Sequence, residues 1–371
     1  MNRLVIVGNG FDLANGLKSR YEDFILAHIN ASIDQVNKTG ERSTNLLYSV
    51  VHNRIRIDKI EPISTIKIKD NESILCIEEF QGASVNYRNE NDWPIDLKYN
   101  FIFVIKSAFF NDLISNKNWT DIEFIYFQHL RKHKIYNPFI KLLNSEFEFL
   151  KKELINYLIQ EEKNSNFNKN LIPFLKIAGK PGRLISNEYE YDIQKFTHRK
   201  YQEFINLNEV LFLNFNYTNV LSEFLNTQKV LSNHYRLINI HGKIEKPETI
   251  IFGYGDEMSP EFRLFSEENN DALIQNFKSF HYASESYYNK LLDFISVEFD
   301  VVVIGHSLGL SDRVLLNTIF ENENCKFIHL FHTGNDSHFR KRLALGRHFN
   351  DSAKFREKLL PENPNFKMPR D

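Results

Sequence analysis

Five short runs of apolar, often β-branched residues are the feature that most constrains how this chain folds. They are residues 4–7, 210–213, 237–240, 301–304 and 327–331. Runs of this kind, separated by stretches with helical spacing, are typical of strands buried on both faces of a parallel sheet. We therefore predict an α/β fold. Residues 249–252 are a weaker candidate for a sixth strand.

The long segment between the first two runs has a different pattern. Apolar residues recur at helical spacing from 139 to 159, after Asn137-Pro138, and predict a long helix. Residues 121–133 predict another helix, whereas residues 47–99 show no regular pattern. We therefore predict a discontinuous α/β domain, a mainly helical insertion and a polar, loosely ordered C-terminal tail. The predicted bounds are 1–30 plus 202–340 for the domain, 31–201 for the insertion and 341–371 for the tail.

Composition excludes several classes of protein and partner. The 371 residues include 46 Lys and Arg against 48 Asp and Glu, so no overall basic field favours nucleic acid or an anionic membrane surface. Two cysteines, Cys76 and Cys325, cannot form a four-cysteine zinc site or a disulfide framework. We therefore expect no zinc and a reducing, cytoplasmic location. No apolar run approaches the roughly 18 residues of a membrane span.

Small or polar residues directly follow four of the five runs. They are Gly-Asn-Gly-Phe-Asp at 8–12, Asn-Phe-Asn-Tyr-Thr at 214–218, His-Gly at 241–242 and Gly-His-Ser-Leu-Gly at 305–309. Ligands of open parallel sheets bind beyond the carboxyl ends of the strands. We therefore expect these four clusters to surround one ligand.

The glycines of the first cluster permit two interpretations. Gly8 and Gly10 could let the backbone approach a phosphate, or could simply form a tight turn from strand to helix. The pattern is not a complete G-x-G-x-x-G, because the third glycine is Gly16. Asp12 could cap the following helix or lie beside the sugar of a ligand.

Two asparagines and a histidine in the next clusters are also ambiguous. Asn214 and Asn216 could close a turn, or could hold a ribose hydroxyl and orient a water molecule. His241 could be structural, but a neutral imidazole at the end of a strand is also suited to accept a proton.

The sequence at 305–309 matches G-x-S-x-G, the nucleophile elbow of α/β-hydrolases. A hydrolase with Ser307 as nucleophile would have to take its other catalytic groups from Asp336 with His338 or His348, in the short remainder of the chain. We favour the other interpretation, in which the loop is a second phosphate cradle. A helix should follow, with Ser311 as its N-cap.

Taken together, these motifs resemble the AbiH family of bacterial phage-defence proteins. The resemblance rests on Val-Gly-Asn-Gly-Phe-Asp-Leu at 7–13, Asn-Phe-Asn-Tyr-Thr at 214–218, Ile-His-Gly at 240–242 and Gly-His-Ser-Leu at 305–308, in that order. The family is in turn distantly similar to sirtuins, whose catalytic Asn and His fall on Asn216 and His241. Thr218 stands where sirtuins have Asp, and the four zinc cysteines are missing, so protein deacylation is not expected.

The resemblance implies a sirtuin-like, Rossmann-type sheet that binds NAD as ligand or substrate. It further implies hydrolysis of the nicotinamide–ribose bond during antiphage defence, in response to an unknown phage-derived trigger; a homo-oligomer is left open. The predicted catalytic residues are His241, as general base, with Asn216 and Asp12. The predicted NAD-binding residues are Gly8, Asn9, Gly10, Phe11, Asn214, Gly305, His306 and Ser307. The alternatives are a non-catalytic nucleotide-binding sensor or scaffold, and a serine hydrolase acting through Ser307.

Overall fold

The chain forms two compact units in the computed structural model. The structure describes residues 1–52, 64–67, 73–78, 99–115, 122–133, 137–164, 167–179, 209–227, 235–282, 286–362 and 367–368. We call Met1–Ser19 with Ile155–Asp371 the discontinuous unit, and Arg20–Leu154 the central unit. The second boundary falls within the long helix α5 (Asn137–Glu162), which therefore contributes residues to both units.

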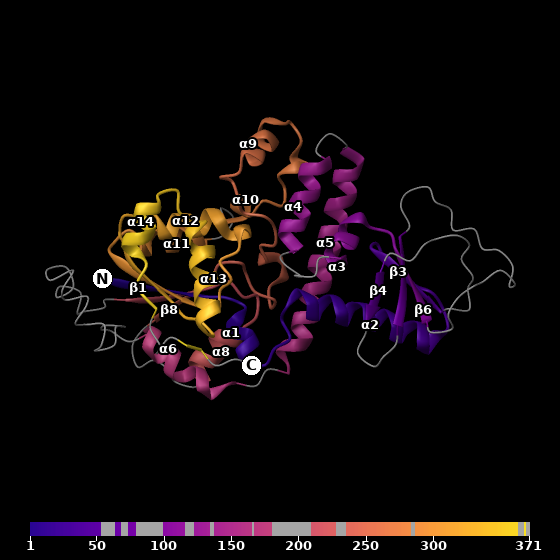
Figure 1. The fold of residues 1–371 in the computed structure, drawn as a ribbon, viewed down its shortest axis with the longest axis horizontal. Coiled ribbons are helices and arrows are strands. Elements are labelled where there is room, and N and C mark those ends of the chain that lie inside the picture. The colour runs from indigo at the N-terminus through magenta and orange to yellow at the C-terminus, as the bar shows by residue number, and fades with distance from the viewer. Residues whose placement is uncertain are drawn as a thin grey trace, which may run out of the picture. The chain divides into compact units, whose positions relative to one another are not determined.

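The discontinuous unit is built around a parallel sheet of five strands (Figure 1). They are β1 (Asn2–Val7), β7 (Val210–Asn214), β8 (Tyr235–Asn239), β9 (Phe299–Ile304) and β10 (Cys325–Leu330). Their order is β10-β9-β1-β7-β8, and every neighbouring pair is parallel. This is the strand order of a Rossmann-like fold with five strands. The prediction of an α/β fold is confirmed, and each of the five predicted runs forms a strand.

The sixth candidate strand, at 249–252, was a wrong prediction. A 3₁₀ turn at Pro247–Thr249 precedes it, and the Ile251 amide makes one backbone hydrogen bond, of 3.0 Å, to the carbonyl of His241. The segment is apolar because Ile251 and Phe252 are buried against the loop after β8, without joining the sheet.

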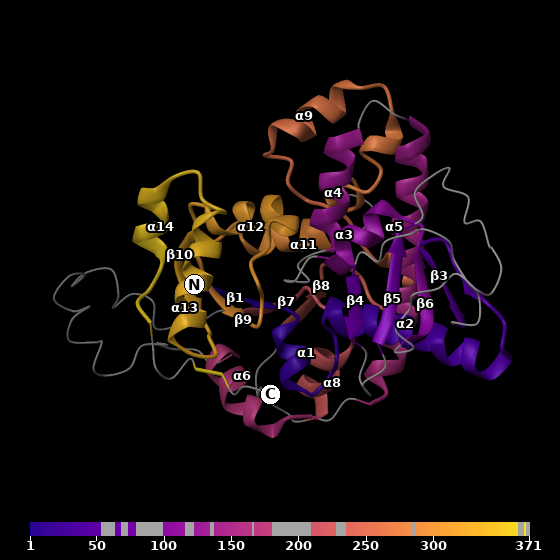
Figure 2. The same cartoon turned by 45° about the vertical axis from the view of Figure 1, so that its right-hand side comes forward.

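The strand order places a topological switch point between β1 and β9, which lie side by side (Figure 2). From β1 the sheet continues through β7 to β8 on one side, and through β9 to β10 on the other. Ligands of such sheets bind where the order reverses, beyond the carboxyl ends of these two strands. The loops that begin at Gly8 and Gly305 occupy this position.

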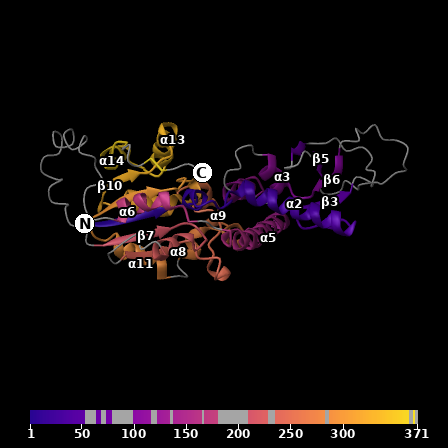
Figure 3. The same ribbon diagram turned by 90° about the horizontal axis from the view of Figure 1, so that it is seen from below.

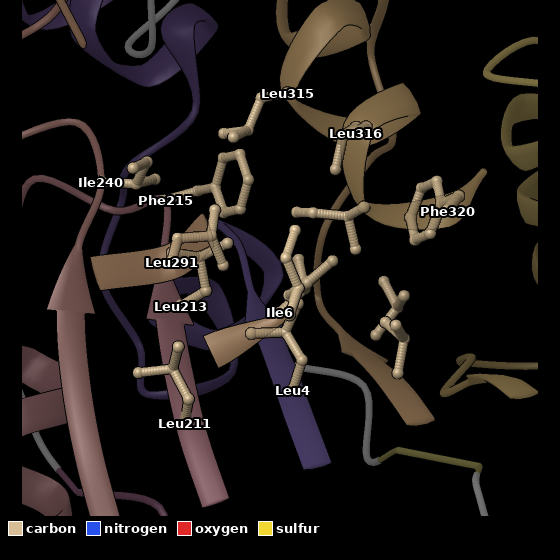
Figure 4. Close-up of a cluster of buried hydrophobic side chains, with 14 of the residues drawn as sticks. Leu4, Ile6, Leu211, Leu213, Phe215, Ile240, Leu291, Leu315, Leu316 and Phe320 are labelled. Carbon is tan, nitrogen blue, oxygen red and sulfur yellow. The ribbon is translucent and has the colours of Figure 1, made fainter. Parts of the chain in front are cut away.

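Alternate residues of the strands pack into separate cores on the two faces of the sheet. Leu4, Ile6, Leu213 and Phe215 belong to one core, which α11 (Ser286–Phe294) and α12 (Arg313–Phe320) complete (Figure 4). The second core contains alternate strand residues and the apolar faces of three helices: Val5, Val7, Phe212, α1 (Gly10–Ala14), α6 (Ile172–Gly179) and α8 (Val220–Thr227). Each fully buried Val or Leu contributes about 1.5–3 kcal/mol to the free energy of folding.

The alternation continues past the end of β7 and directs its polar residues. Phe215 remains in the first core, in a row with Leu211 and Leu213 (Figure 4). Asn216 has the opposite parity and contacts Asp12 of α1 instead. The period of the strand therefore decides which face each functional side chain reaches.

The central unit contains a second sheet in addition to helices (Figure 3). Its strands lie in the order β2 (Ser43–Thr44), β3 (Tyr48–His52), β6 (Tyr99–Ile105), β5 (Ser73–Glu78) and β4 (Ser64–Lys67). Its helices are α2 (Tyr21–Thr39), α3 (Ala108–Ser115), α4 (Ile122–His133) and most of α5. The helices predicted at 121–133 and from Asn137 are confirmed. The sheet was not predicted. Some of its pairs are close in sequence, as for Thr44 and Ser49, but the pair of β3 with β6 joins distant segments, as for Tyr48 and Ile105.

The C-terminal segment is folded, and the prediction of a loose tail was wrong. It forms α13 (Asn335–Gly346) and α14 (Ser352–Lys358). Phe349, Phe355 and Leu359 pack against the first core, and the Met368 amide donates to the His332 carbonyl at 2.7 Å. A polar average composition concealed these spaced apolar residues. The remaining short helices are α9 (Pro260–Glu267), α10 (Lys278–Tyr282), and the 3₁₀ turns Lys169–Leu171, Asp271–Leu273 and Leu310–Asp312.

Candidate functional site

Two clusters of buried polar side chains lie at the carboxyl end of the parallel sheet. The first, which we call the amide–carboxyl cluster, consists of Asp12, Asn214, Asn216, Thr218 and Asn239. Asp12 Oδ1 accepts a hydrogen bond of 2.8 Å from Asn216 Nδ2, and Oδ2 accepts one of 2.5 Å from the Thr218 hydroxyl. Asn216 Nδ2 also lies 3.3 Å from the carbonyl oxygen of Gly8. The first turn of α1 and the loop after β7 are thus joined through Asp12.

Asn214 supports this cluster from the end of β7. Its Nδ2 donates to Asn239 Oδ1 at 2.9 Å, and its Oδ1 accepts from the Asn216 amide at 3.1 Å. Both ends of its side-chain amide therefore have protein partners. Asn214 fixes the position of Asn216, which leaves Asn216 and Asp12 as the members of the cluster with catalytic potential.

Asp12 is a buried carboxyl group with no cationic partner among the residues that the structure describes. It is 1% exposed, and its hydrogen bonds come from neutral groups. Burial raises its pKa to about 7, although Thr218 and Asn216 oppose the shift, and the nearby charge of Glu162 raises the pKa further. A cationic group placed beside Asp12 would lower this pKa again and favour the ionised carboxylate.

The second cluster, which we call the imidazole–carboxylate cluster, is centred on Asp312 and includes His241, His306, Lys278 and Tyr282. Asp312 Oδ1 lies 2.7 Å from Lys278 Nζ and 3.2 Å from His241 Nε2, while Oδ2 lies 3.7 Å from His306 Nε2. His241 Nε2 is also 3.2 Å from the Tyr282 hydroxyl. All five residues are buried. Although burial alone would raise the pKa of Asp312, Lys278 and the two imidazoles hold it well below its ordinary value.

The hydrogen bonds of the two histidines determine their states. The Leu308 amide donates to His306 Nδ1 at 3.0 Å, so the neutral ring carries its proton on Nε2, which faces Asp312. Burial lowers the pKa of His306 to about 3. Burial and the Lys278 charge lower the pKa of His241, against the opposing effects of Asp312 and a hydrogen bond to the Phe215 backbone. Both rings are therefore neutral at physiological pH, and Nε2 of His241 already has protein partners.

Phe215 and the glycine loops lie where the two clusters approach each other. The Phe215 ring is 5.1 Å from the His241 ring and 4.3 Å from the His306 ring, measured between centroids. A Cβ atom on Gly8 would lie 2.6 Å from His306 Cα, so the loops after β1 and β9 are in close contact. Within the described chain, no hydrogen bond joins His241 to Asn216 or Asp12. The predicted catalytic residues thus divide between two adjacent clusters.

The backbone of the first glycine loop is largely occupied by protein contacts. The amide of Gly8 donates to Ile304, that of Gly10 to Gly305 at 2.8 Å, and that of Phe11 back to Gly8. The Phe11 side chain is fully buried against Phe224. Asn9 exchanges side-chain hydrogen bonds with Ser19. A phosphate at this loop would therefore have to be held by groups other than these three amides.

The loop after β9 carries the most unusual backbone in the described chain. Leu308, buried and with φ of 58°, adopts the left-handed conformation, which costs a non-glycine residue roughly 1–2 kcal/mol. Its amide is held by His306 and its carbonyl by His348 Nε2 at 3.0 Å. Helix α12 begins only at Arg313, after a 3₁₀ turn, so the predicted N-cap at Ser311 is not observed.

Ser307 in the same loop is exposed and is not part of a Ser-His-acid triad among the described residues. His348 instead contacts the Leu308 carbonyl, and His338 Nδ1 lies 3.5 Å from Glu362. A nucleophile elbow strains the serine itself. Here the strained residue is Leu308.

The sequence interpretation missed Asp312, Lys278, Tyr282 and the contact made by Thr218. Asp312 comes soon after a glycine-rich loop, which is a weak signal that could have singled it out. Lys278 and Tyr282 belong to a five-residue helix far from any strand end in the sequence, and no pattern indicates their position.

The fold and the buried polar clusters at its carboxyl edge define a Rossmann-like α/β protein. Within that class the chain belongs to the AbiH family, because the family model described as "Bacteriophage abortive infection AbiH" matches residues 4–333. The family suggests a role in phage abortive infection. No curated protein and no solved structure matches the chain, and the similarity to sirtuins stays a prediction.

Two further features of the described residues bear on ligands and location. No group of three or more His, Cys, Asp or Glu residues among them is arranged to hold a metal ion. None of the helices described is long and apolar enough to cross a membrane.

Proposed function

We propose that this protein acts in phage defence by binding NAD at the carboxyl end of the parallel sheet and hydrolysing its nicotinamide–ribose bond. The observation that carries the proposal is the state of Asp12. This carboxyl group is buried at the switch-point end of a Rossmann-ordered sheet, and in the described part of the chain its hydrogen bonds come only from neutral donors. A site of this kind favours a ligand that brings a positive charge to the carboxylate.

The chemistry of NAD matches that requirement. The bond between the pyridinium nitrogen and ribose C1′ breaks with its electron pair going to the nitrogen, so nicotinamide leaves neutral and needs no general acid. Positive charge then develops on the ribose, where a carboxylate stabilises it as in glycoside hydrolysis. Asp12 would supply that carboxylate, and the Asn216 amide beside it would orient the ribose or the attacking water.

Water completes the reaction by adding its oxygen to C1′ and losing a proton, and the products are nicotinamide and ADP-ribose. His241 would accept the proton as general base. Its Nε2 lies 3.2 Å from both the Tyr282 hydroxyl and Oδ1 of Asp312, and a carboxylate oxygen can only accept a hydrogen bond. Water must therefore replace both partners before Nε2 can take a proton. We expect this exchange to accompany activation.

The test measures NAD and phage resistance together. Cells carrying the wild-type protein should lose NAD and gain nicotinamide and ADP-ribose after infection, as followed by mass spectrometry. Asp12→Asn and His241→Ala should each reduce the rate by about 100-fold or more, the usual range for loss of an electrostatic or acid–base group. Asp34→Asn, at an exposed position of α2, is the matched control and should retain activity.

The proposal fails if NAD stays constant through infection while His241→Ala still protects fully. The partners of His241 Nε2 specifically favour one second candidate, a protein that binds the nucleotide without cleaving it. In that case NAD should raise the melting temperature of both the wild-type protein and His241→Ala, with no turnover in either.

A further inference from the structure

Lys341 of α13 places an ammonium group at the carboxyl end of the sheet. Its Nζ donates a hydrogen bond of 2.7 Å to the carbonyl of Phe331, which directly follows β10. The Phe331 amide in turn donates to Val303 of β9 at 3.0 Å. The charge of Lys341 also acts on His306, in the loop after β9. Lys341 thus lies at the carboxyl end of β10, the strand next to β9, and comes from a helix beyond the family match, which ends at residue 333.

Among the described residues the partly buried ammonium group of Lys341 has no counter-charge, whereas three other buried or partly buried cations of the discontinuous unit have one. Lys278 faces Asp312, Arg3 faces Asp300, and Arg313 lies 3.3 Å from Asp256. Buried Lys358 also lacks an ion pair in the described chain, but its Nζ donates to two carbonyl groups, those of Phe320 and Asn322. Among the described residues, Lys341 forms no ion pair and has one acceptor for its three N–H groups. Burial lowers its pKa to about 8, so the side chain is still mainly charged at pH 7.

Backbone donors in the adjacent loop are also available. The amides of His306 and Ser307 make no hydrogen bond within the part of the chain that is described, and Ser307 is exposed. In the first glycine loop, by contrast, three amides are already occupied. Unpaired amides next to a cation form the kind of site that binds phosphate oxygens.

We propose that Lys341 binds a phosphate group of the nucleotide, together with the loop at His306 and Ser307. The inference rests on the proposed function, since it assigns the phosphate end of the ligand to β9 and β10. It leaves the scissile end to Asp12 and Asn216 near β1 and β7. Rossmann-like folds bind dinucleotides across the switch point and hold the pyrophosphate at the turn after the first strand. Here three amides of that turn already donate to carbonyl groups, and the phosphate is assigned to the loop after β9 instead.

The experiment measures the binding of three probes by calorimetry: inorganic pyrophosphate, ADP-ribose and nicotinamide riboside, which lacks phosphate. Lys341→Met should weaken pyrophosphate and ADP-ribose about tenfold or more, as expected for a lost charge-assisted hydrogen bond. Nicotinamide riboside should bind unchanged, and Lys341→Arg should retain most of the affinity. Arg340→Met removes an exposed charge one residue away and is the matched control.

A second measurement uses the wild-type chain and so does not depend on the folding of a variant. An amine-acetylating reagent is applied with and without pyrophosphate, and each lysine is followed by mass spectrometry. Pyrophosphate should slow acetylation of Lys341 and leave Lys354 of α14 unaffected. Equal acetylation of Lys341 in both samples, or tight pyrophosphate binding by Lys341→Met, would overturn the assignment. If ADP-ribose binding depends on Lys341 but NAD is not hydrolysed, the proposed hydrolysis is refuted and the assignment of Lys341 to the phosphate stands.

Discussion

A carboxyl group is buried at each end of the parallel sheet, and the two are stabilised in different ways. At the amino end, Asp300 of β9 accepts hydrogen bonds from Arg3 of β1, at 2.8 Å from Nη2 and 3.0 Å from Nε. At the carboxyl end, Asp12 accepts hydrogen bonds only from an amide and a hydroxyl among the described residues. Both carboxyl groups are nearly inaccessible to solvent. Burial of an acidic residue therefore does not by itself distinguish a structural group from a functional one.

The two buried carboxyl groups differ in whether a positively charged side chain lies beside them. The planar guanidinium of Arg3 matches the carboxylate of Asp300 with parallel hydrogen bonds, and Arg3 Nη1 also reaches the carbonyl of Ala178 in α6 at 3.4 Å. This pair joins the two strands that flank the switch point, and each of its charges is neutralised by the other. Asp12 has no such partner in the described chain, so a positive charge that stabilises its carboxylate would have to come from a ligand.

The largest expected effect concerns the complete pair. Arg3→Leu should lower the free energy of unfolding by about 3–5 kcal/mol, because it leaves Asp300 buried without its counter-charge. Urea denaturation followed by circular dichroism measures the loss. The double variant Arg3→Leu with Asp300→Leu should recover most of it, since removing both charges also removes the desolvation cost. A double variant as unstable as the single one would contradict a purely structural role.

A smaller, pH-dependent effect is expected at Asp12. The folded-state pKa of about 7 exceeds the unfolded value of 3.8, so the folded protein holds a proton that the unfolded chain has released between these values. Wild-type stability should therefore fall, relative to Asp12→Asn, as pH rises from about 4 to about 7. At about 1.4 kcal/mol per pKa unit, the upper limit of the difference is roughly 4 kcal/mol, reached above pH 7.

The measurement compares melting curves of wild type and Asp12→Asn from pH 4 to pH 8. Asn keeps the shape of the side chain and can still pair with Asn216 and Thr218, so near pH 4 the two proteins should be about equally stable. An Asp12→Asn variant that is destabilised at pH 8 would show that the ionised carboxylate is satisfied in the folded protein. The contrast with Asp300 would then disappear.

Much of the parallel sheet could be predicted from the sequence because its signals are local. A strand such as Val301–Ile304 within β9 is a short apolar run, and apolarity over consecutive residues is the direct consequence of burial on both faces. The central unit mixes two cases: residues 101–105 of β6 also form a continuous apolar run, although no strand was predicted there, whereas β2, β3 and β4 contain no such run. Tyr48 pairs with Ile105, and no local pattern records a partner so distant in sequence.

The candidate site was predictable only where a residue directly ends a strand. Asn216 and His241 follow β7 and β8 closely, so the edge they occupy could be inferred from topology. The residues that these two side chains contact could not be inferred. The Lys278 ammonium reaches Asp312 from a short helix. The Lys341 ammonium reaches the carbonyl of Phe331 from the segment expected to be a loose tail. Such contacts depend on packing in three dimensions, for which a single sequence has no periodic signal.

The smallest expected effect tests what the first glycine loop does. A Cβ atom on Gly10 would lie 2.8 Å from Cα and from the carbonyl oxygen of Gly305, both of them backbone atoms that cannot rotate away. Gly10→Ala should therefore cost about 1–3 kcal/mol of stability without any ligand. Gly346→Ala, where the nearest heavy atom is 3.8 Å away, should change stability by less than about 1 kcal/mol.

The result decides between the two interpretations of Gly8 and Gly10. A loss of stability in the ligand-free protein, measured by urea denaturation, supports tight packing of the loops after β1 and β9. If Gly10→Ala is as stable as wild type but binds pyrophosphate more weakly, the glycine serves a phosphate cradle instead. Because the amides of Gly8, Gly10 and Phe11 already donate to carbonyl groups, we expect the first outcome. The carboxyl edge would then combine a rigid loop after β1 with phosphate binding after β9, at the loop of His306 and Ser307.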